Sequence, residues 1–108
     1  MKILIAGYGF VGKATELVLR DYHDIVIHDP YLGYKADWTK VDAVVVCVST
    51  PPRPDGSCEM DNVFNVVEMC PDVPILIKST ISVEGWQMIS DTFPNKQICF
   101  SPEFLRQA

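Results

Sequence analysis

The chain has 108 residues, 48% of them hydrophobic and 21% charged, which indicates one folded domain with a single core rather than a disordered segment. Its formal net charge of −5, with acids spread along the sequence, argues against a nucleic-acid-binding protein, because such a protein needs a basic surface to displace counterions from phosphates. No apolar run approaches the ~20 residues that span a bilayer, and Met1 and Lys2 lead straight into a strand pattern without a signal peptide, so we expect no membrane partner and a cytoplasmic protein.

The first part of the chain alternates strand and helix patterns. Residues 2–6 form a short β-rich run, and residues 11–20 follow a helical pattern that places Val11, Ala14, Leu17 and Val18 on one face. Residues 25–28 predict a second strand. The polar stretch 29–42 is short, and we expect it to lack a full helix.

The alternation continues to the end of the chain. Residues 43–48 are almost continuously apolar, which is typical of a strand in the middle of a parallel sheet that helices cover on both faces. Asp61 is expected to be the N-cap of a helix over residues 62–69. A strand at 74–77, a helix at 83–92 and a strand at 97–100 complete the pattern.

This order of elements predicts a Rossmann-type α/β fold, in which a doubly wound parallel sheet of about five strands is the middle of three α/β/α layers. The connections between parallel strands should be right-handed crossovers. We expect residues 1–108 to form a single domain. Because few residues follow Phe100, the six-stranded dinucleotide-binding sheet is one strand short.

The turn between the first strand and the first helix matches the pattern G-x-G-x-x-G with the residues Gly7, Tyr8, Gly9, Phe10, Val11 and Gly12. In a dinucleotide-binding turn the first glycine permits the tight bend, the second lets the backbone approach a pyrophosphate, and the third lets helix and strand pack closely. The positive end of the following helix favours the phosphate charge. Such a string also occurs in ordinary turns that hold no ligand.

Asp29 follows the second strand, at the spacing from Gly12 expected for the acid that binds the adenine ribose of a dinucleotide. A carboxylate there disfavours the 2′-phosphate of NADP, and Pro30 and Tyr31 supply no arginine to bind one. We therefore expect NAD as the cofactor, with Asp29 and Pro30 at its ribose, although Lys35 lies nearby and leaves NADP open. The alternative is a turn-forming Asp-Pro pair without a ligand.

The four cysteines form no C-x-x-C pair, and with only two histidines we expect free thiols and no metal site. Cys47 and Cys99 fall in apolar strand patterns, where a thiol behaves as a small hydrophobic group. Cys58, in the loop after Gly56, is the one that we expect to be exposed.

Three further strings each follow a predicted strand: Cys47-Val48-Ser49-Thr50-Pro51 running on to Asp55-Gly56-Ser57, then Lys78-Ser79-Thr80-Ile81, and finally Ser101-Pro102-Glu103-Phe104-Leu105-Arg106. With the glycine turn, these strings and their order resemble the N-terminal domain of the UDP-glucose/GDP-mannose dehydrogenases over nearly the whole chain. The carboxyl ends of parallel strands are where open α/β sheets bind ligands, so the position of the strings fits a binding site.

The resemblance implies a role for several of these residues. Ser49, Thr50 and Pro51 would line the cofactor groove, and Thr80 would contact the cofactor and help to position a catalytic water. Glu103 would act in acid–base catalysis at the sugar-nucleotide site, whose substrate contacts would include Phe104, Leu105 and Arg106.

Each of these assignments has a structural alternative. Residues 51–56 read as a stiff surface turn. Ser79, Thr80 and Ser82 read as caps of the next helix, and Pro102 with Glu103 reads as an ordinary helix start.

The resemblance also implies an oxidoreductase that uses NAD to oxidise the C6 alcohol of a nucleotide sugar to a carboxylate, through thioester chemistry on a cysteine. None of the four cysteines matches the family's nucleophile, and Gln107 stands where the family usually has an acid. This chain is therefore expected not to be catalytic alone, and the homodimer contacts of the family would come from regions that it lacks. Two alternatives stay open: a stand-alone dinucleotide-binding or sensing module without catalysis, and a domain of another hydroxyacid-type dehydrogenase.

Overall fold

The structure is a computed structural model of the chain, and it describes residues 1–51, 53–55 and 59–101. Its strands are β1 (Lys2–Ala6), β2 (Asp24–His28), β3 (Ala43–Val46), β4 (Ile75–Ile77) and β5 (Ile98–Phe100). Its helices are α1 (Phe10–Leu19), α2 (Asp61–Met69) and α3 (Val83–Thr92), with a short 3₁₀ turn η1 (Pro30–Leu32) after β2. The expected elements are all present, with ends that differ by one or two residues.

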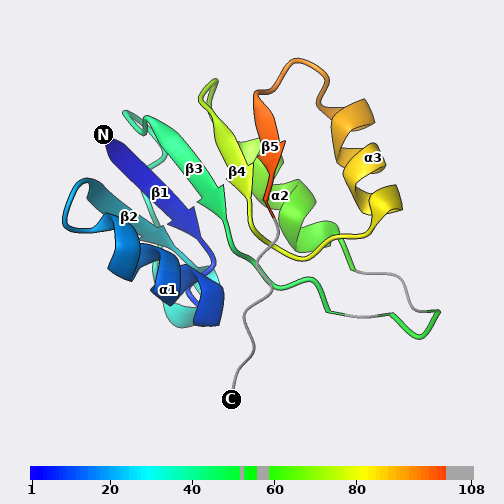
Figure 1. Cartoon of the computed structure of the whole chain (residues 1–108), viewed down its shortest axis with the longest axis horizontal. Helices are drawn as coiled ribbons and strands as arrows, with labels where there is room; N and C mark the ends of the chain where they lie inside the picture. The colour runs from blue at the N-terminus through cyan, green and yellow to red at the C-terminus, as the bar shows by residue number, and fades with distance from the viewer. Residues whose placement is uncertain (52, 56–58, 102–108) are drawn as a thin grey trace.

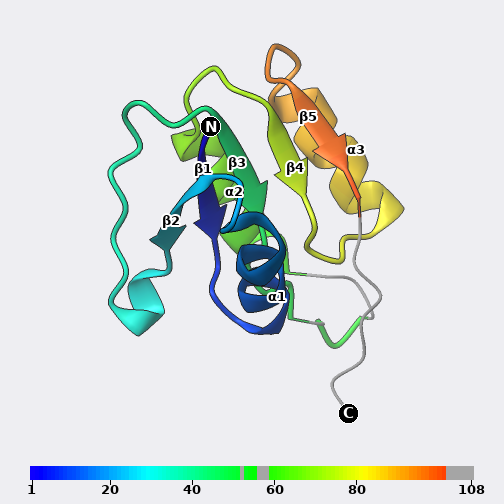
Figure 2. The ribbon, with the colours of Figure 1, turned by 60° about the vertical axis from the view of Figure 1, so that its left-hand side comes forward.

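The strands form one parallel sheet in the order β2-β1-β3-β4-β5. Helix α1 covers one face, and α2 and α3 cover the other (Figures 1 and 2). The predicted Rossmann-type three-layer fold is thereby confirmed. From β1 the chain continues to β2 on one side and then to β3 on the other side of β1, so the strand order reverses between β1 and β3. Doubly wound sheets bind ligands at such a point, beyond the carboxyl ends of the strands.

The alternation of side chains along each strand divides the core into two clusters. On the face of α2 and α3, the side chains of Leu4, Val44 and Ile77 are fully buried. On the face of α1, a smaller cluster contains Ile5 and Val45. Strands apolar on both faces require cover on both sides, and the helices on the two faces provide it.

The segment between β2 and β3 contains no α-helix, as expected, and its residues Ala36 and Trp38 pack directly against the larger cluster. It is too short for a helix and a further strand, so β2 remains an edge strand. In the six-stranded order 3-2-1-4-5-6 of dinucleotide-binding sheets, strand 3 lies beyond strand 2 at the edge. The short segment between β2 and β3 leaves out this strand. Among the described residues, the strand that the sheet lacks relative to this six-stranded order is therefore at the β2 edge, and not after Phe100 as the sequence suggests.

The buried face of α1 differs from its apolar stripe, and the expected N-cap of α2 is wrong. Leu17 and Val18 of α1 are 59% and 70% exposed, because the helix turns Gly12 and Leu19 toward the sheet instead. Asp61 is not an N-cap but the first residue of α2. The carboxylate of Glu59, two residues earlier, accepts the Asp61 N–H at 3.2 Å and so serves the helix start.

The cysteines also differ from expectation. Cys99 is exposed, because it pairs with Leu76 on the α1 face of the sheet, where the edge strand β5 lies away from α1. Cys58 lies outside the described residues. Cys70 is buried, and burial raises the pKa of its thiol to about 11. Within the described residues, no helix is long and apolar enough to cross a membrane.

Candidate functional site

A cavity of about 800 Å³ lies beyond the carboxyl ends of β1 to β4, where the topology predicts a ligand. Its lining comes from the glycine turn, the end of β2, the segment after β3, one face of α2 and the segment after β4. Of the predicted site residues within the described part of the chain, those that line it are Gly7, Gly9, Phe10, Val11, Asp29, Pro30, Ser49, Thr50 and Thr80.

The three glycines of the turn face different surroundings. Gly7 has a φ of +96°, and a Cβ there would lie 2.7 Å from the backbone of Cys47. A Cβ on Gly12 would lie 2.0 Å from the Gly7 carbonyl oxygen. A Cβ on Gly9 would meet nothing within 4 Å. The fold itself therefore explains the first and third glycines, whereas the second borders open space that a ligand can fill.

Helix α1 begins at this open space. Its N-cap is Gly9, which offers no side-chain acceptor to the first turn. The first N–H groups of a helix have no partner within the helix and carry its positive partial charge. Phe10 and Val11, in this first turn, line the cavity. The space over Gly9 and these donors together fit a pyrophosphate, which is the group that a dinucleotide would present there.

Asp29 is joined to the glycine turn by a hydrogen bond, because its Oδ2 accepts the backbone N–H of Tyr8 at 2.8 Å. Its backbone also closes a tight loop, with Asp29 N–H donating to the Tyr34 carbonyl at 2.8 Å and Tyr34 N–H donating back at 3.0 Å. Asp29 is thus part of a turn, as the structural alternative states, but its carboxylate does not cap that turn. One carboxylate oxygen accepts from the Tyr8 N–H, and Asp29 lines the cavity.

Tyr8 and Gly12 are absent from the described lining of the cavity. The Tyr8 hydroxyl donates to the Glu16 carboxylate at 2.5 Å, which raises the pKa of the phenol. Its ring meets the edge of Tyr34 at 5.5 Å between centroids and lies below the Lys13 ammonium at 5.6 Å. Tyr8 therefore links the glycine turn to the loop after β2 through both its backbone and its ring.

The segments after β3 and β4 are bound to each other at the far side of the cavity. The Thr50 hydroxyl donates to the Thr80 carbonyl at 2.5 Å, and the Ser79 hydroxyl donates to the Val48 carbonyl at 2.7 Å. Of the three residues read as helix caps, Ser82 caps α3 by accepting the Gly85 N–H at 3.0 Å. The Thr80 side chain is not needed for that cap.

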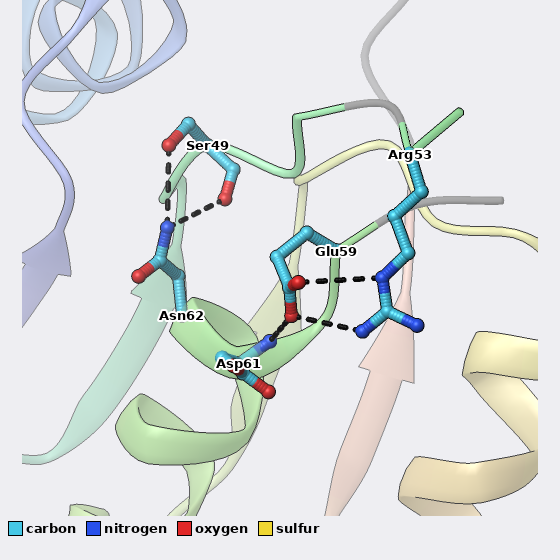
Figure 3. A network of polar contacts seen from close by, with 5 residues as sticks. All are labelled: Ser49, Arg53, Glu59, Asp61 and Asn62. Carbon is cyan, nitrogen blue, oxygen red and sulfur yellow. Dashed lines mark hydrogen bonds and ion pairs between the residues drawn. The ribbon is translucent and has the colours of Figure 1, made fainter. Parts of the chain in front are cut away.

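Pro51 begins the loop that leads to α2 and is not part of the described cavity lining. Its carbonyl accepts the Glu59 N–H at 2.8 Å, and the Arg53 guanidinium pairs with the Glu59 carboxylate at 3.1 Å, across the loop (Figure 3). This pairing lowers the pKa of Glu59. The other predicted site residues, Glu103, Phe104, Leu105 and Arg106, lie outside the described residues.

Sequence reasoning missed two groups of cavity residues. Tyr31 and Leu32 follow Asp29 in η1 and line the cavity, and Tyr31 is 92% exposed. Helix α2 contributes Asn62, Asn65, Val66 and Met69. Their spacing of three, four and seven residues is that of one helix face, so the signal was present in the sequence. That this face borders a cavity is visible only in the fold.

No family model matches the chain. Among solved structures, the chain is similar to a UDP-glucose dehydrogenase from the hyperthermophilic archaeon Pyrobaculum islandicum, with a TM-score of 0.65 and 20% sequence identity. The similarity covers 98% of this chain and 36% of that one, so this chain spans about a third of that enzyme's length. The likeness agrees with the Rossmann-type α/β fold that the sheet order defines.

Proposed function

We propose that this chain is the NAD-binding domain of a nucleotide-sugar 6-dehydrogenase of the UDP-glucose type. The observation that carries the proposal is the single cavity onto which the glycine turn, Asp29 and Thr80 converge from separate parts of the sequence. The fold likeness to a UDP-glucose dehydrogenase supports the same proposal.

The arrangement suits a dinucleotide laid across the carboxyl ends of the strands. The adenine ribose would lie at Asp29, directly after β2, and the pyrophosphate at the start of α1, beside β1. With the strand order β2-β1-β3-β4, the nicotinamide end would then lie over Ser49 and Thr80. Although the chain has a net charge of −5, the phosphates need no basic patch, because the helix N–H groups supply the positive potential.

NAD is the dinucleotide that the acid favours. A 2′-phosphate about 4 Å from the Asp29 carboxylate would be repelled by up to about 4 kcal/mol at an effective dielectric constant near 20, and by less where water reaches the pair. The Asp29 Oδ1, which has no hydrogen-bond partner among the described residues, would accept from ribose hydroxyls, since Tyr8 occupies only Oδ2. His28 and Lys78 are the basic side chains along the described cavity lining, and the lining contains no arginine.

In the intact enzyme, bound NAD would accept hydride from the sugar C6. Thr80 would contact the cofactor and help to position water, and Glu103 would serve acid–base catalysis at the sugar-nucleotide site. Because no cysteine of this chain matches the family's nucleophile, the chain alone would bind the cofactor without completing the oxidation.

Calorimetric titration of the 108-residue chain with NAD and, separately, with NADP tests the proposal. Saturable binding that is tighter for NAD is the expected result. Absence of binding for both dinucleotides at millimolar concentration would refute it. Tighter binding of NADP would leave a dinucleotide site but overturn the role given to Asp29.

A further inference from the structure

Residues 48–50 follow the end of β3, and each of them takes part in a hydrogen bond that involves a side chain. Ser79 donates to the Val48 carbonyl at 2.7 Å, and the Thr50 hydroxyl reaches the Thr80 carbonyl at 2.5 Å. Between them, Ser49 is held from a third element, helix α2, by Asn62. Ser49 therefore lines the cavity with its position fixed from outside its own strand.

Asn62 makes two contacts with Ser49 (Figure 3). Its Nδ2 donates to the Ser49 carbonyl at 3.1 Å and to the Ser49 hydroxyl oxygen at 3.3 Å. Asn62 is the second residue of α2, and the start of this helix is anchored by the Glu59 carboxylate at the Asp61 N–H. Glu59 is in turn paired with Arg53. The amide that reaches Ser49 thus projects from an anchored helix end.

These contacts decide what Ser49 can offer a ligand. Its carbonyl and one lone pair of its hydroxyl are already used as acceptors. Its hydroxyl hydrogen stays available, and its backbone N–H has no partner within the described part of the chain. A hydroxyl is a donor as well as an acceptor, so occupying its acceptor side favours its use as a donor. Ser49 consequently presents donors to the cavity.

We propose that Asn62 is a positioning residue that makes Ser49 a hydrogen-bond donor for an acceptor oxygen at the nicotinamide end of the dinucleotide. The carboxamide oxygen of nicotinamide is an acceptor of this kind. Because β1 lies between β2 and β3, Ser49 stands on the other side of the glycine turn from Asp29, where that end of the ligand would lie. The inference rests on the proposed function.

The test compares two ligands that share the adenine, both riboses and the pyrophosphate. NAD carries nicotinamide, and ADP-ribose lacks it. Asn62→Asp removes the donor and leaves the shape of the side chain unchanged. An acid in the first turn of a helix is favourable, which opposes the repulsion between the new carboxylate and the Ser49 carbonyl oxygen, so the melting temperature should change little. Asn62→Ala serves as a second variant without the added charge, and Asn95→Ala, in an exposed turn before β5, is the matched control.

The affinity of Asn62→Ala for NAD should fall about tenfold, the loss of one good hydrogen bond, and its affinity for ADP-ribose should change less than about twofold. The added charge of Asn62→Asp acts on the pyrophosphate of both ligands, so for this variant the ratio of NAD to ADP-ribose affinity should fall about tenfold. Asn95→Ala should change neither. Because Asn62 acts through Ser49, its substitution should have less effect on NAD binding when Ser49 is already alanine. A merely structural role would lower the affinity for both ligands together.

An unchanged ratio of NAD to ADP-ribose affinity in both Asn62 variants would overturn the inference while leaving the proposed function standing. If the wild-type chain bound neither ligand, the proposed function and this inference would fail together. The wild-type titration therefore separates the two failures.

Discussion

Replacing Gly9 with aspartate separates the stability of the fold from the binding of a dinucleotide. Gly9 is the N-cap of α1 and has a φ of −86°, and a Cβ there would meet nothing within 4 Å. Aspartate is among the preferred N-cap residues, and it stabilises a helix relative to glycine by about a few tenths of a kcal/mol. The Gly9→Asp variant should therefore fold normally and melt at or slightly above the wild-type temperature.

The same carboxylate would stand where the pyrophosphate is expected. Two like charges about 4 Å apart repel by about 4 kcal/mol at an effective dielectric constant of 20, which corresponds to an affinity loss of about a thousandfold. The aspartate would also take the helix N–H groups that should bind the phosphates. Calorimetric titration with NAD, with circular dichroism as the check on folding, measures both effects.

Gly12→Ala is the contrasting variant. Its Cβ would lie 2.0 Å from the Gly7 carbonyl oxygen, so α1 must move away from the turn. Here the loss should appear first in stability, as a lower urea midpoint.

A Gly9→Asp protein that is well folded and binds NAD within about twofold of wild type would refute the placement of the pyrophosphate.

Three other substitutions test separate parts of the structure. Asp29→Asn should narrow the preference for NAD over NADP about tenfold or more, because the repulsion of the 2′-phosphate is lost; an unchanged ratio, measured by titration with each dinucleotide, would show that the acid does not face the ribose. Lys96→Met should lower the free energy of unfolding by about 1–3 kcal/mol in urea, because the Lys96 ammonium donates to the carbonyls of Val67 and Cys70 at 2.7 and 2.8 Å, and NAD affinity should stay the same. Burial lowers the pKa of His28 below 6.5, and its Nδ1 accepts the Ala36 N–H at 3.2 Å, so the folded state binds a proton less readily than the unfolded state. Stability should therefore fall as the pH drops below about 6.5, and His28→Asn, which keeps an acceptor but does not titrate, should flatten the slope of urea midpoint against pH.

Local sequence predicted the helices and strands well because each is specified by the spacing of its own apolar residues and glycines. The continuous apolar run at β3 needs cover on both faces wherever it lies, so a central position in the sheet followed from the sequence. The spacing of Gly7, Gly9 and Gly12 after a strand is equally local. The local pattern could not show why each glycine is needed. Gly7 is required by the backbone of Cys47, and Gly12 is required by the carbonyl of Gly7.

The errors arose where a partner from elsewhere in the chain decided the outcome. Asp61 has the residue type of an N-cap, but the Glu59 carboxylate, which pairs with Arg53, accepts the backbone N–H at the start of the helix. Leu17 and Val18 complete a plausible apolar stripe, yet the small Gly12 lets α1 approach the sheet on a different face. Cys99 lies in an apolar strand whose edge position removes the cover expected for it.

The sequence by itself determined that this chain forms alternating strands and helices with a glycine turn followed by an acid, because those features depend on backbone freedom and on the period of apolar residues. Only the tertiary structure decided that the turn, Asp29, Ser49, Thr80 and one face of α2 enclose one cavity. That convergence depends on the strand order, which brings the carboxyl ends of strands distant in sequence to one edge of the sheet. Asn62 reaches Ser49 for the same reason: parallel pairing and the packing of α2 fix their separation, and no local pattern encodes it.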